Sequence, residues 1–261
     1  MEEIRLNKYL SQMGICSRRE ADRLIESGNV LVDGQKAFMG MKIRENQRVT
    51  CNGRWVGQTD PEHTSGAARP KAVLLAVNKP KGVVCTTSDK DRALNIVQMV
   101  DYPVRVYPVG RLDKDSEGLI FLTNQGELVN KIMRGAAGHE KEYVVLIDRP
   151  VTHDFAKKME AGIYLKELDV TTRPCRVFRS GEREFHIILT QGLNRQIRRM
   201  CETLGCHVKN LKRIRIMNVT LGSLKAGAFR KVTPKEQEVL YRLLEGPAGK
   251  GEASWKKNLE E

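Results

Sequence analysis

Apolar residues recur with two different periods along this chain, and the change of period divides the sequence into two parts. In the first sixty residues, Leu6 and Leu10 recur at helical spacing after a charged start. Ser17 and Glu20 form a capping box at the start of a second amphipathic stretch, which Gly28 ends. The pattern therefore predicts two short consecutive helices near the amino terminus.

Short apolar runs follow these two helices. Val30–Val32 and Val49–Cys51 have the composition of β-strands, and Asp33-Gly34 favours a tight hairpin turn. Residues 1–60 are therefore predicted to form a small helix-turn-helix-hairpin domain. Gly57–Lys71 is rich in Gly, Pro, Ser and Thr without apolar periodicity, which predicts a linker over residues 61–71.

From residue 72 the pattern changes to apolar strands interleaved with a few helices. Thr152 is positioned to cap one helix that Gly162 ends, and Thr233 begins a capping box with Pro234 at the first helical position. This mixture predicts an α+β domain over residues 72–245, with a mixed, largely antiparallel β-sheet flanked by helices. The polar residues 246–261 are expected to be disordered. The predicted strands are Val73–Val77, Val83–Cys85, Leu119–Leu122, Val144–Ile147 and Phe185–Leu189.

Charge and cysteine usage narrow the class of partner. The chain carries 45 Lys and Arg against 32 Asp and Glu, a surplus that favours a polyanion, with nucleic acid ahead of a membrane surface. The six cysteines form no C-x-x-C pair and no Cys/His spacing suited to zinc, so we expect reduced thiols and no metal. No apolar run approaches the roughly 20 residues that span a bilayer, and we expect a cytoplasmic protein without membrane contact.

One carboxylate occupies an unusual place in this basic chain. Asp113 lies two residues after Arg111 in the block PVGRLDKDSEGLIFLTN, just ahead of the apolar run Leu119–Leu122. Most acidic residues here can be explained as solvated charges. A carboxylate held between a Gly-Arg-Leu start and a buried strand is a candidate for chemistry.

A second candidate segment is the block QGLNRQIRRM at residues 191–200. Asn194 is predicted to cap a helix that Gly205 ends. One face of this helix is apolar and the other carries guanidinium groups. A helix of this kind binds RNA with or without a catalytic duty. The apolar stripe is Ile197, Met200, Cys201 and Leu204, and the opposite face is Arg195, Arg198, Arg199 and Glu202.

Four segments together resemble the motifs of the pseudouridine synthases, in the branch that modifies ribosomal RNA. The resemblance extends over nearly all of residues 79–244. It implies that the chain isomerises uridine to pseudouridine in RNA, a reaction that needs no cofactor. The motifs are Lys79-Pro80-Lys81-Gly82, Arg111-Leu112-Asp113 with Ser116, Gly118 and Leu119, Lys141-Glu142-Tyr143, and Asn194–Met200.

The resemblance also implies roles for individual residues. Asp113 is the implied catalytic carboxylate, acting as nucleophile or as base. Tyr143 is the implied stacking platform for the target base, although a strand tyrosine by itself is typical of ordinary packing. An arginine is expected to pair with Asp113, with Arg198 as first choice and Arg195 as second. The target base must be flipped out of its stack, and Arg111 is the candidate to fill the gap.

Further basic residues are expected to bind RNA. The amino-terminal domain resembles the RNA-binding domain of ribosomal small-subunit protein four (S4), whose second helix would present several guanidinium groups to phosphates. The expected RNA-binding residues are Arg18, Arg19, Arg23, Lys81, Arg111, Arg195 and Arg199.

The sequence motifs specify the RNA substrate less narrowly than they specify the reaction. Gln191-Gly192-Leu193 and Arg215–Val219 look most like the large-subunit type of this branch. A uridine in a stem-loop of 23S rRNA is then the implied substrate, with another rRNA or transfer RNA as the alternative, and we expect a monomer. A non-catalytic ribosome-assembly protein would leave Asp113 as a structural ion pair. An RNA methyltransferase would need a glycine-rich turn after its first strand, whereas the G-x-G at residues 249–251 lies in the tail.

Overall fold

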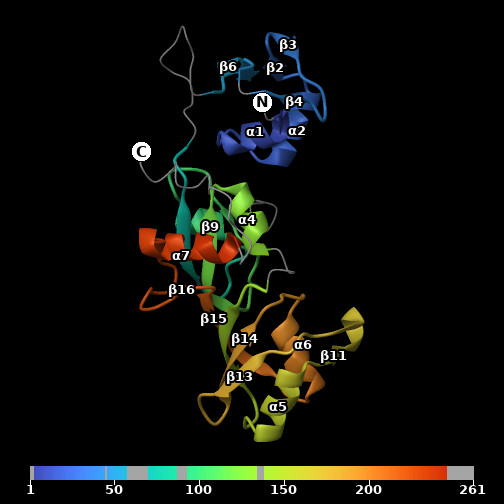
Figure 1. Ribbon diagram of the computed structural model, residues 1–261, viewed down its shortest axis with the longest axis vertical. Helices are drawn as coiled ribbons and strands as arrows, with labels where there is room; N and C mark the ends of the chain where they lie inside the picture. Colours follow the sequence, from blue (N-terminus) through green and yellow to red (C-terminus); the bar gives the residue numbers. More distant parts are fainter. Residues whose placement is uncertain (1–2, 45, 58–69, 87–92, 134–137, 246–261) are drawn as a thin grey trace. The chain divides into compact units, whose positions relative to one another are not determined.

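A computed structural model describes residues 3–44, 46–57, 70–86, 93–133 and 138–245 (Figure 1). The chain divides into two compact units. The first is residues 1–72 with the short pieces 103–105 and 124–126, and the second is the remainder. Most of the predicted linker, residues 61–69, and the whole predicted tail, residues 246–261, lie outside the described residues.

The first unit has the predicted order of two helices followed by hairpin strands. Ser17 caps the second helix by accepting a hydrogen bond from the Glu20 backbone N–H at 3.1 Å. Asp33 and Gly34 both adopt positive φ, +52° and +80°, as a two-residue hairpin turn requires. The elements are β1 (Ile4–Arg5), α1 (Leu6–Gln12), α2 (Arg18–Glu26), β2 (Val30–Val32), β3 (Gln35–Lys36), β4 (Lys42–Ile43), β5 (Val49–Cys51) and β6 (Arg54–Trp55).

The core of the first unit lies between its helices and its small sheet. The strand order is β3-β2-β5-β6, and β1 pairs separately with β4. Leu6, Leu10, Ile25 and Val30 are almost fully buried in this core. The other face of α2 exposes the three arginines expected to bind RNA, Arg18, Arg19 and Arg23.

The second unit is built on one mixed sheet with the order β13-β14-β10-β15-β9-β7-β17. β9 and β15 run parallel, and the other neighbours in this order run antiparallel. The predicted α+β architecture with a largely antiparallel sheet is therefore confirmed. The strands are β7 (Leu74–Lys79), β8 (Tyr107–Pro108), β9 (Glu117–Thr123), β10 (Lys141–Ile147), β13 (Arg176–Arg179), β14 (Glu184–Leu189), β15 (Val208–Ile216), β16 (Val219–Thr220) and β17 (Phe229–Lys231).

One predicted strand is wrong. Residues 83–85 are not a strand of the sheet, because Val84 exchanges its backbone hydrogen bonds with Leu94 and Ile96 and forms only an isolated bridge to Asn95. An apolar run of three residues has the composition of a strand whether or not a partner strand is available.

Helices cover this sheet around two separate cores. The helices and the small hairpin of the second unit are α3 (Ile96–Val100), α4 (Gly126–Met133), α5 (His153–Ala161), β11 (Tyr164–Leu165), a 3-10 turn (Lys166–Leu168), β12 (Val170–Thr171), α6 (Gln196–Thr203) and α7 (Pro234–Glu245). Thr152 and Thr233 cap α5 and α7 as predicted. Within the described part of the chain, no helix is long and apolar enough to cross a bilayer.

The first core joins α5 and α6 to β10, β13 and β14, and it includes Phe155, Phe185 and Met200. The second core joins α4 and α7 to β7 and β9 around Phe121 and Leu240. In Figure 1, α5 and α6 lie beside β13 and β14 at one end of the sheet, whereas α4 and α7 lie beside β9 at the other end. The loop that precedes β9 and the start of α6 meet between these two cores.

Candidate active site

Asp113 lies on a short loop that is anchored at both ends. Leu112, immediately before it, is buried, and the backbone N–H of Ser116 donates to the Asp113 carbonyl at 3.1 Å. Strand β9 begins at Glu117. The Asp113 side chain is 33% exposed, so its carboxylate is held by the loop while remaining open to a ligand.

The turn after β7 is hydrogen-bonded to this loop. Lys79 is fully buried, and its Nζ donates to the carbonyls of Pro80 at 2.9 Å and Val83 at 2.8 Å. Burial lowers the pKa of Lys79, an effect that nearby Cys85 and the carboxylates of the loop oppose. The Gly82 N–H then donates to the Lys114 carbonyl at 2.8 Å. The Lys-Pro-Lys-Gly motif thus braces the loop of Asp113, and Lys81 itself lies exposed in that turn.

Gly118 of the Asp113 block allows two strands to approach closely. The parallel pairing of β9 with β15 sets Gly118 opposite Arg213. A Cβ at Gly118 would lie 2.2 Å from the Arg213 carbonyl oxygen, and the residue has a φ of +105°. Only glycine meets both conditions without strain. Arg213 in turn donates from Nε to the Leu119 carbonyl at 2.6 Å, which ties the two strands together just after the loop.

The start of α6 brings two arginines to the same place. Arg195, and not Asn194 as predicted, is the N-cap residue, and it adopts a left-handed conformation with φ of +50°. Non-glycine residues rarely adopt this conformation, which is enriched at functional sites. Asn194 instead accepts a hydrogen bond from Arg199 Nε through its carbonyl oxygen at 3.1 Å. Arg199 also contacts Glu167 in the hairpin β11–β12.

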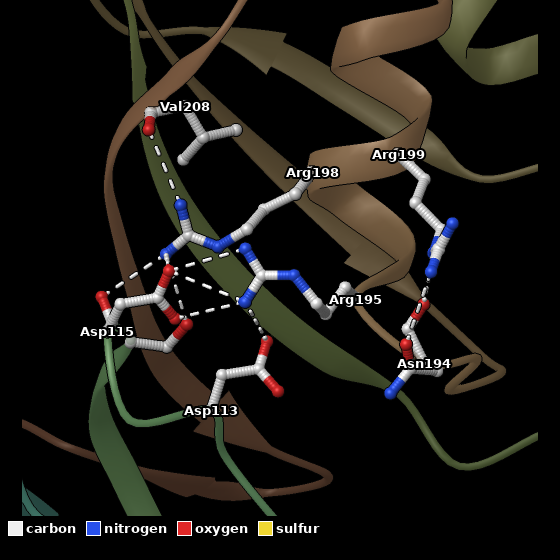
Figure 2. Close-up of polar contacts among 8 residues, drawn as sticks. Asp113, Asp115, Asn194, Arg195, Arg198, Arg199 and Val208 are labelled. Atoms are coloured by element: carbon white, nitrogen blue, oxygen red, sulfur yellow. Dashed lines mark hydrogen bonds and ion pairs between the residues drawn. The ribbon is translucent and has the colours of Figure 1, made fainter.

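The two arginines contact different carboxylates of the loop (Figure 2). Arg195 Nη1 lies 3.6 Å from Asp113 Oδ2 and 3.4 Å from Asp115 Oδ1. Arg198 Nη2 lies 3.2 Å from Asp115 Oδ2 and also donates to the Asp115 carbonyl at 3.2 Å. The expected pairing of Arg198 with Asp113 is therefore corrected to Arg195, the second choice. Arg198 is buried because it reaches from α6 across to β15 and the loop, so it does not belong to the exposed face that the helical period predicted.

Tyr143 lies on the same side of the sheet as α6. Its ring packs against the core that includes Ile197 and Met200 of that helix. Strand register places Tyr143 opposite Arg213, which in turn lies opposite Gly118. Two inter-strand spacings amount to about 10 Å, so the backbone of Tyr143 lies about that far from the start of β9. The Tyr143 ring is only partly buried by its contact with this core.

Sequence reasoning missed two charged residues around this site, Asp115 and Arg213. Asp115 was passed over inside a block chosen for Asp113. Arg213 is 4% exposed, and its guanidinium carbon lies 5.9 Å from the centre of the Tyr143 ring. The two-residue period places Arg213 on the same strand face as buried Leu211, and that was the available signal. Burial, with Arg213 as a nearby like charge, lowers the pKa of Lys141 to about 8.

Comparisons with known proteins find matches for both units of the chain. The family profile described as RNA pseudouridylate synthase matches residues 73–203, and the S4 domain profile matches residues 4–49. The dual-specificity RNA pseudouridine synthase RluF of Escherichia coli K12 is 49% identical over 242 residues, which cover 93% of this chain and 80% of that protein. Ribosomal large subunit pseudouridine synthase B of Bacillus subtilis is 32% identical over 92% of this chain and 96% of its own. A crystal structure of a pseudouridylate synthase superposes with a TM-score of 0.64 at 25% identity, covering 92% of this chain and 99% of that one.

Proposed function

The chain belongs to the RNA pseudouridylate synthase family, and from that membership we propose that it isomerises a uridine in a stem-loop of 23S rRNA, with transfer RNA as a second substrate. It is an enzyme with an amino-terminal S4 domain. The relative from Bacillus subtilis is named for the large ribosomal subunit, and the relative from Escherichia coli is named dual-specificity. These names support the two substrate classes. From the proposed rRNA substrate we infer that the enzyme acts in the cytoplasm, and we propose that it acts as a monomer.

The observation that carries the proposed site is the half-open carboxylate of Asp113 beside Arg195 on a braced loop. Isomerisation breaks the bond between the ribose and N1 of uracil and rejoins the ribose to C5, so nothing is oxidised and no group is imported. Asp113 would act on the sugar or the base as an ionised carboxylate. Arg195 would orient that carboxylate, since a guanidinium is a fixed planar donor.

The surrounding residues would hold the flipped nucleotide. Extruding a uridine from a stem costs a few kcal/mol, which phosphate contacts from a basic site offset. Arg111 is exposed beside Asp113 and would enter the vacated stack. Tyr143 would offer a ring face to the extruded base. Arg198 is buried and would act through the loop, because its contacts are to Asp115, Ser116 and Val208.

The substrate assignment is tested by mapping. The purified full chain is incubated with 23S rRNA, 16S rRNA and total tRNA from a strain that lacks the enzyme, and pseudouridine is mapped in each by mass spectrometry. We expect one 23S stem-loop position and a tRNA position. Modification of 16S rRNA alone would contradict the proposed substrate. RNA binding without any pseudouridine would support the non-catalytic alternative.

Tyr143 is expected to act through its ring. Tyr143→Phe keeps the ring face and its contact with Arg213, whereas Tyr143→Ala loses both. Stacking on a base contributes about 1–3 kcal/mol, so the alanine variant should lose about tenfold to 100-fold more single-turnover activity than the phenylalanine variant. Thermal unfolding of both variants controls for core packing. Equal activity of the two folded variants would assign Tyr143 to the core alone.

The amino-terminal domain is expected to contribute affinity rather than chemistry. Arg18, Arg19 and Arg23 lie exposed on α2, so replacing all three by Gln should weaken RNA binding and reduce the slope of log Kd against log salt by about 2–3. The rate at saturating RNA should remain. A control variant replaces exposed Lys157, Lys158 and Lys166 by Gln, which removes the same charge from the catalytic unit. If the α2 variant has the same slope of log Kd against log salt as the unsubstituted protein, this helix does not bind RNA.

A further inference from the structure

Asp115 is the carboxylate around which both arginines of α6 are arranged. Figure 2 shows contacts from its side chain to the guanidinium groups of both Arg195 and Arg198, whereas Asp113 is contacted by Arg195 alone. Arg195 donates to Asp115 from both Nη atoms, with three N–O distances of 3.4 Å. Arg198 Nη2 lies 3.2 Å from Asp115 Oδ2. One side chain thus engages both cations.

The contact of Arg195 with Asp113 is smaller by comparison. It consists of one N–O distance of 3.6 Å, which is longer than each of the three Arg195–Asp115 distances and does not meet the hydrogen-bond distance that those three meet. Three contacts to Asp115 against one to Asp113 indicate that Asp115 sets the position of the Arg195 guanidinium. Arg195 is 41% exposed, so little packing would hold its long side chain in place without such a partner.

Arg198 connects this arrangement to the rigid part of the fold. Its side chain is 9% exposed and starts from α6, whose neighbouring residues Ile197 and Met200 lie in the core. It donates to the backbone carbonyl of Asp115 at 3.2 Å and to Ser116 Oγ at 3.4 Å. Arg198 therefore contacts Asp115 through both its backbone carbonyl and its carboxylate. Because the Asp115 carboxylate is fixed in this way, it can fix the position of the Arg195 guanidinium.

We propose that Asp115 is a positioning residue for the isomerisation: its carboxylate fixes the guanidinium of Arg195 so that the guanidinium is aimed at the carboxylate of Asp113. The inference rests on the proposed role of Asp113. Asp115 itself does not react, and it acts through Arg195. Reacting groups lose rate steeply when they are displaced by about 1 Å, and an arginine released from Asp115 has that freedom.

If Asp115 is a positioning residue, replacing it should change the rate of the chemical step and RNA affinity differently. Replacing a merely solvated charge should not slow the chemical step. Asp115 is a half-exposed negative charge near a surface that binds a polyanion. Removing that charge lowers the repulsion of phosphates, so RNA should bind Asp115→Asn as tightly as the natural enzyme or more tightly. The same change should slow the chemical step. A loss of rate combined with unchanged or tighter binding is thus the signature of the proposal.

The experiment measures single-turnover rates and RNA dissociation constants for the full-length protein on its RNA substrate. For Asp115→Asn we expect the rate to fall about tenfold to 100-fold, with the dissociation constant unchanged or lower. Asp115→Glu, which keeps the charge, should recover most of the rate and also serves if the Asn variant folds poorly. The matched control is Asp154→Asn, which removes the same charge from an exposed ion pair with Lys158 on α5 and should leave both quantities unchanged.

A double-mutant cycle tests whether Asp115 acts through Arg195. In an Arg195→Gln background, Asp115→Asn should lower the rate by no more than about threefold, because the group it positions is already absent. Multiplicative effects of the two changes would overturn the proposal. The proposal would also be overturned if Asp115→Asn had the same single-turnover rate as the unsubstituted enzyme, or if the Asp154→Asn control lost as much rate as Asp115→Asn. If Asp113→Asn keeps its activity, the proposed site itself fails. If Asp113→Asn is inactive while Asp115→Asn has its full rate, only the positioning role fails.

Discussion

Asp113→Asn is expected to lower the single-turnover rate of pseudouridine formation by about 10⁴-fold or more, while RNA affinity stays within a few fold. The amide is nearly the same size as the carboxylate, but it carries no charge and is neither a nucleophile nor a base. RNA affinity should survive because exposed cations such as Arg111 carry the phosphate contacts. Rates are measured with enzyme in excess over RNA, and affinity is measured by filter binding.

Two companion measurements make this result decisive. Asp113→Ala tests whether the loss depends on the charge rather than on the new amide, and Asp154→Asn shows what the same change of charge does elsewhere. The circular dichroism spectrum of each variant reports whether it has folded. Pseudouridine formed by folded Asp113→Asn at a rate near that of the natural enzyme would remove Asp113 from the chemistry and return it to a structural ion pair.

Gly118→Ala, which adds one methyl group, should strongly lower the stability of the catalytic unit. Its Cβ would lie 2.2 Å from the Arg213 carbonyl oxygen and 2.7 Å from the Arg213 backbone nitrogen, where the two central strands pair. Left-handed strain costs about 1–2 kcal/mol and overpacking about 1–3 kcal/mol, so the free energy of unfolding should fall by about 2–5 kcal/mol. Calorimetry measures this loss, and faster hydrogen exchange in β9 and β15 locates it.

Gly227→Ala is the matched control for backbone conformation. Gly227 also has a positive φ, +80°, but nothing lies within 4 Å of the position of its Cβ. This variant should lose only the strain contribution, about 1–2 kcal/mol, and should keep its natural exchange rates in β9 and β15. Equal losses from the two substitutions would show that backbone conformation, and not the close approach of β9 to β15, explains the glycine at position 118.

Local signals in the sequence were enough for most elements, and the reaction was implied by the resemblance of four motifs to a known family. The caps at Ser17, Thr152 and Thr233 act within one helical turn, and the Asp33-Gly34 turn acts within one hairpin, so each could be recognised from neighbouring residues alone. The strand predicted over residues 83–85 failed because strand formation depends on a partner, and a partner is not a local property.

The choice between Arg195 and Arg198 shows the same limit at the site. Helical periodicity predicted which residues share a face of α6, and that part holds for the buried Ile197 and Met200. Periodicity could not predict that Arg195 would leave the helix in a left-handed conformation and reach Asp113, or that Arg198 would turn inward to Asp115. Both outcomes depend on a loop about 80 residues earlier in the chain.

Residue patterns along the chain were sufficient to predict the two-part organisation, the α+β class, the basic character that favours RNA, and Asp113 as the candidate carboxylate. These follow from composition, from short-range periodicity and from motifs whose residues are neighbours. The fold was needed to show which arginine contacts Asp113, why Gly118 must be glycine, that Asp115 contacts Arg195 and Arg198, and that Arg213 lies over the Tyr143 ring. The physical reason is that these contacts are made by strands and loops distant in sequence, and their distances are set by how β9, β10 and β15 pair and how α6 packs on them.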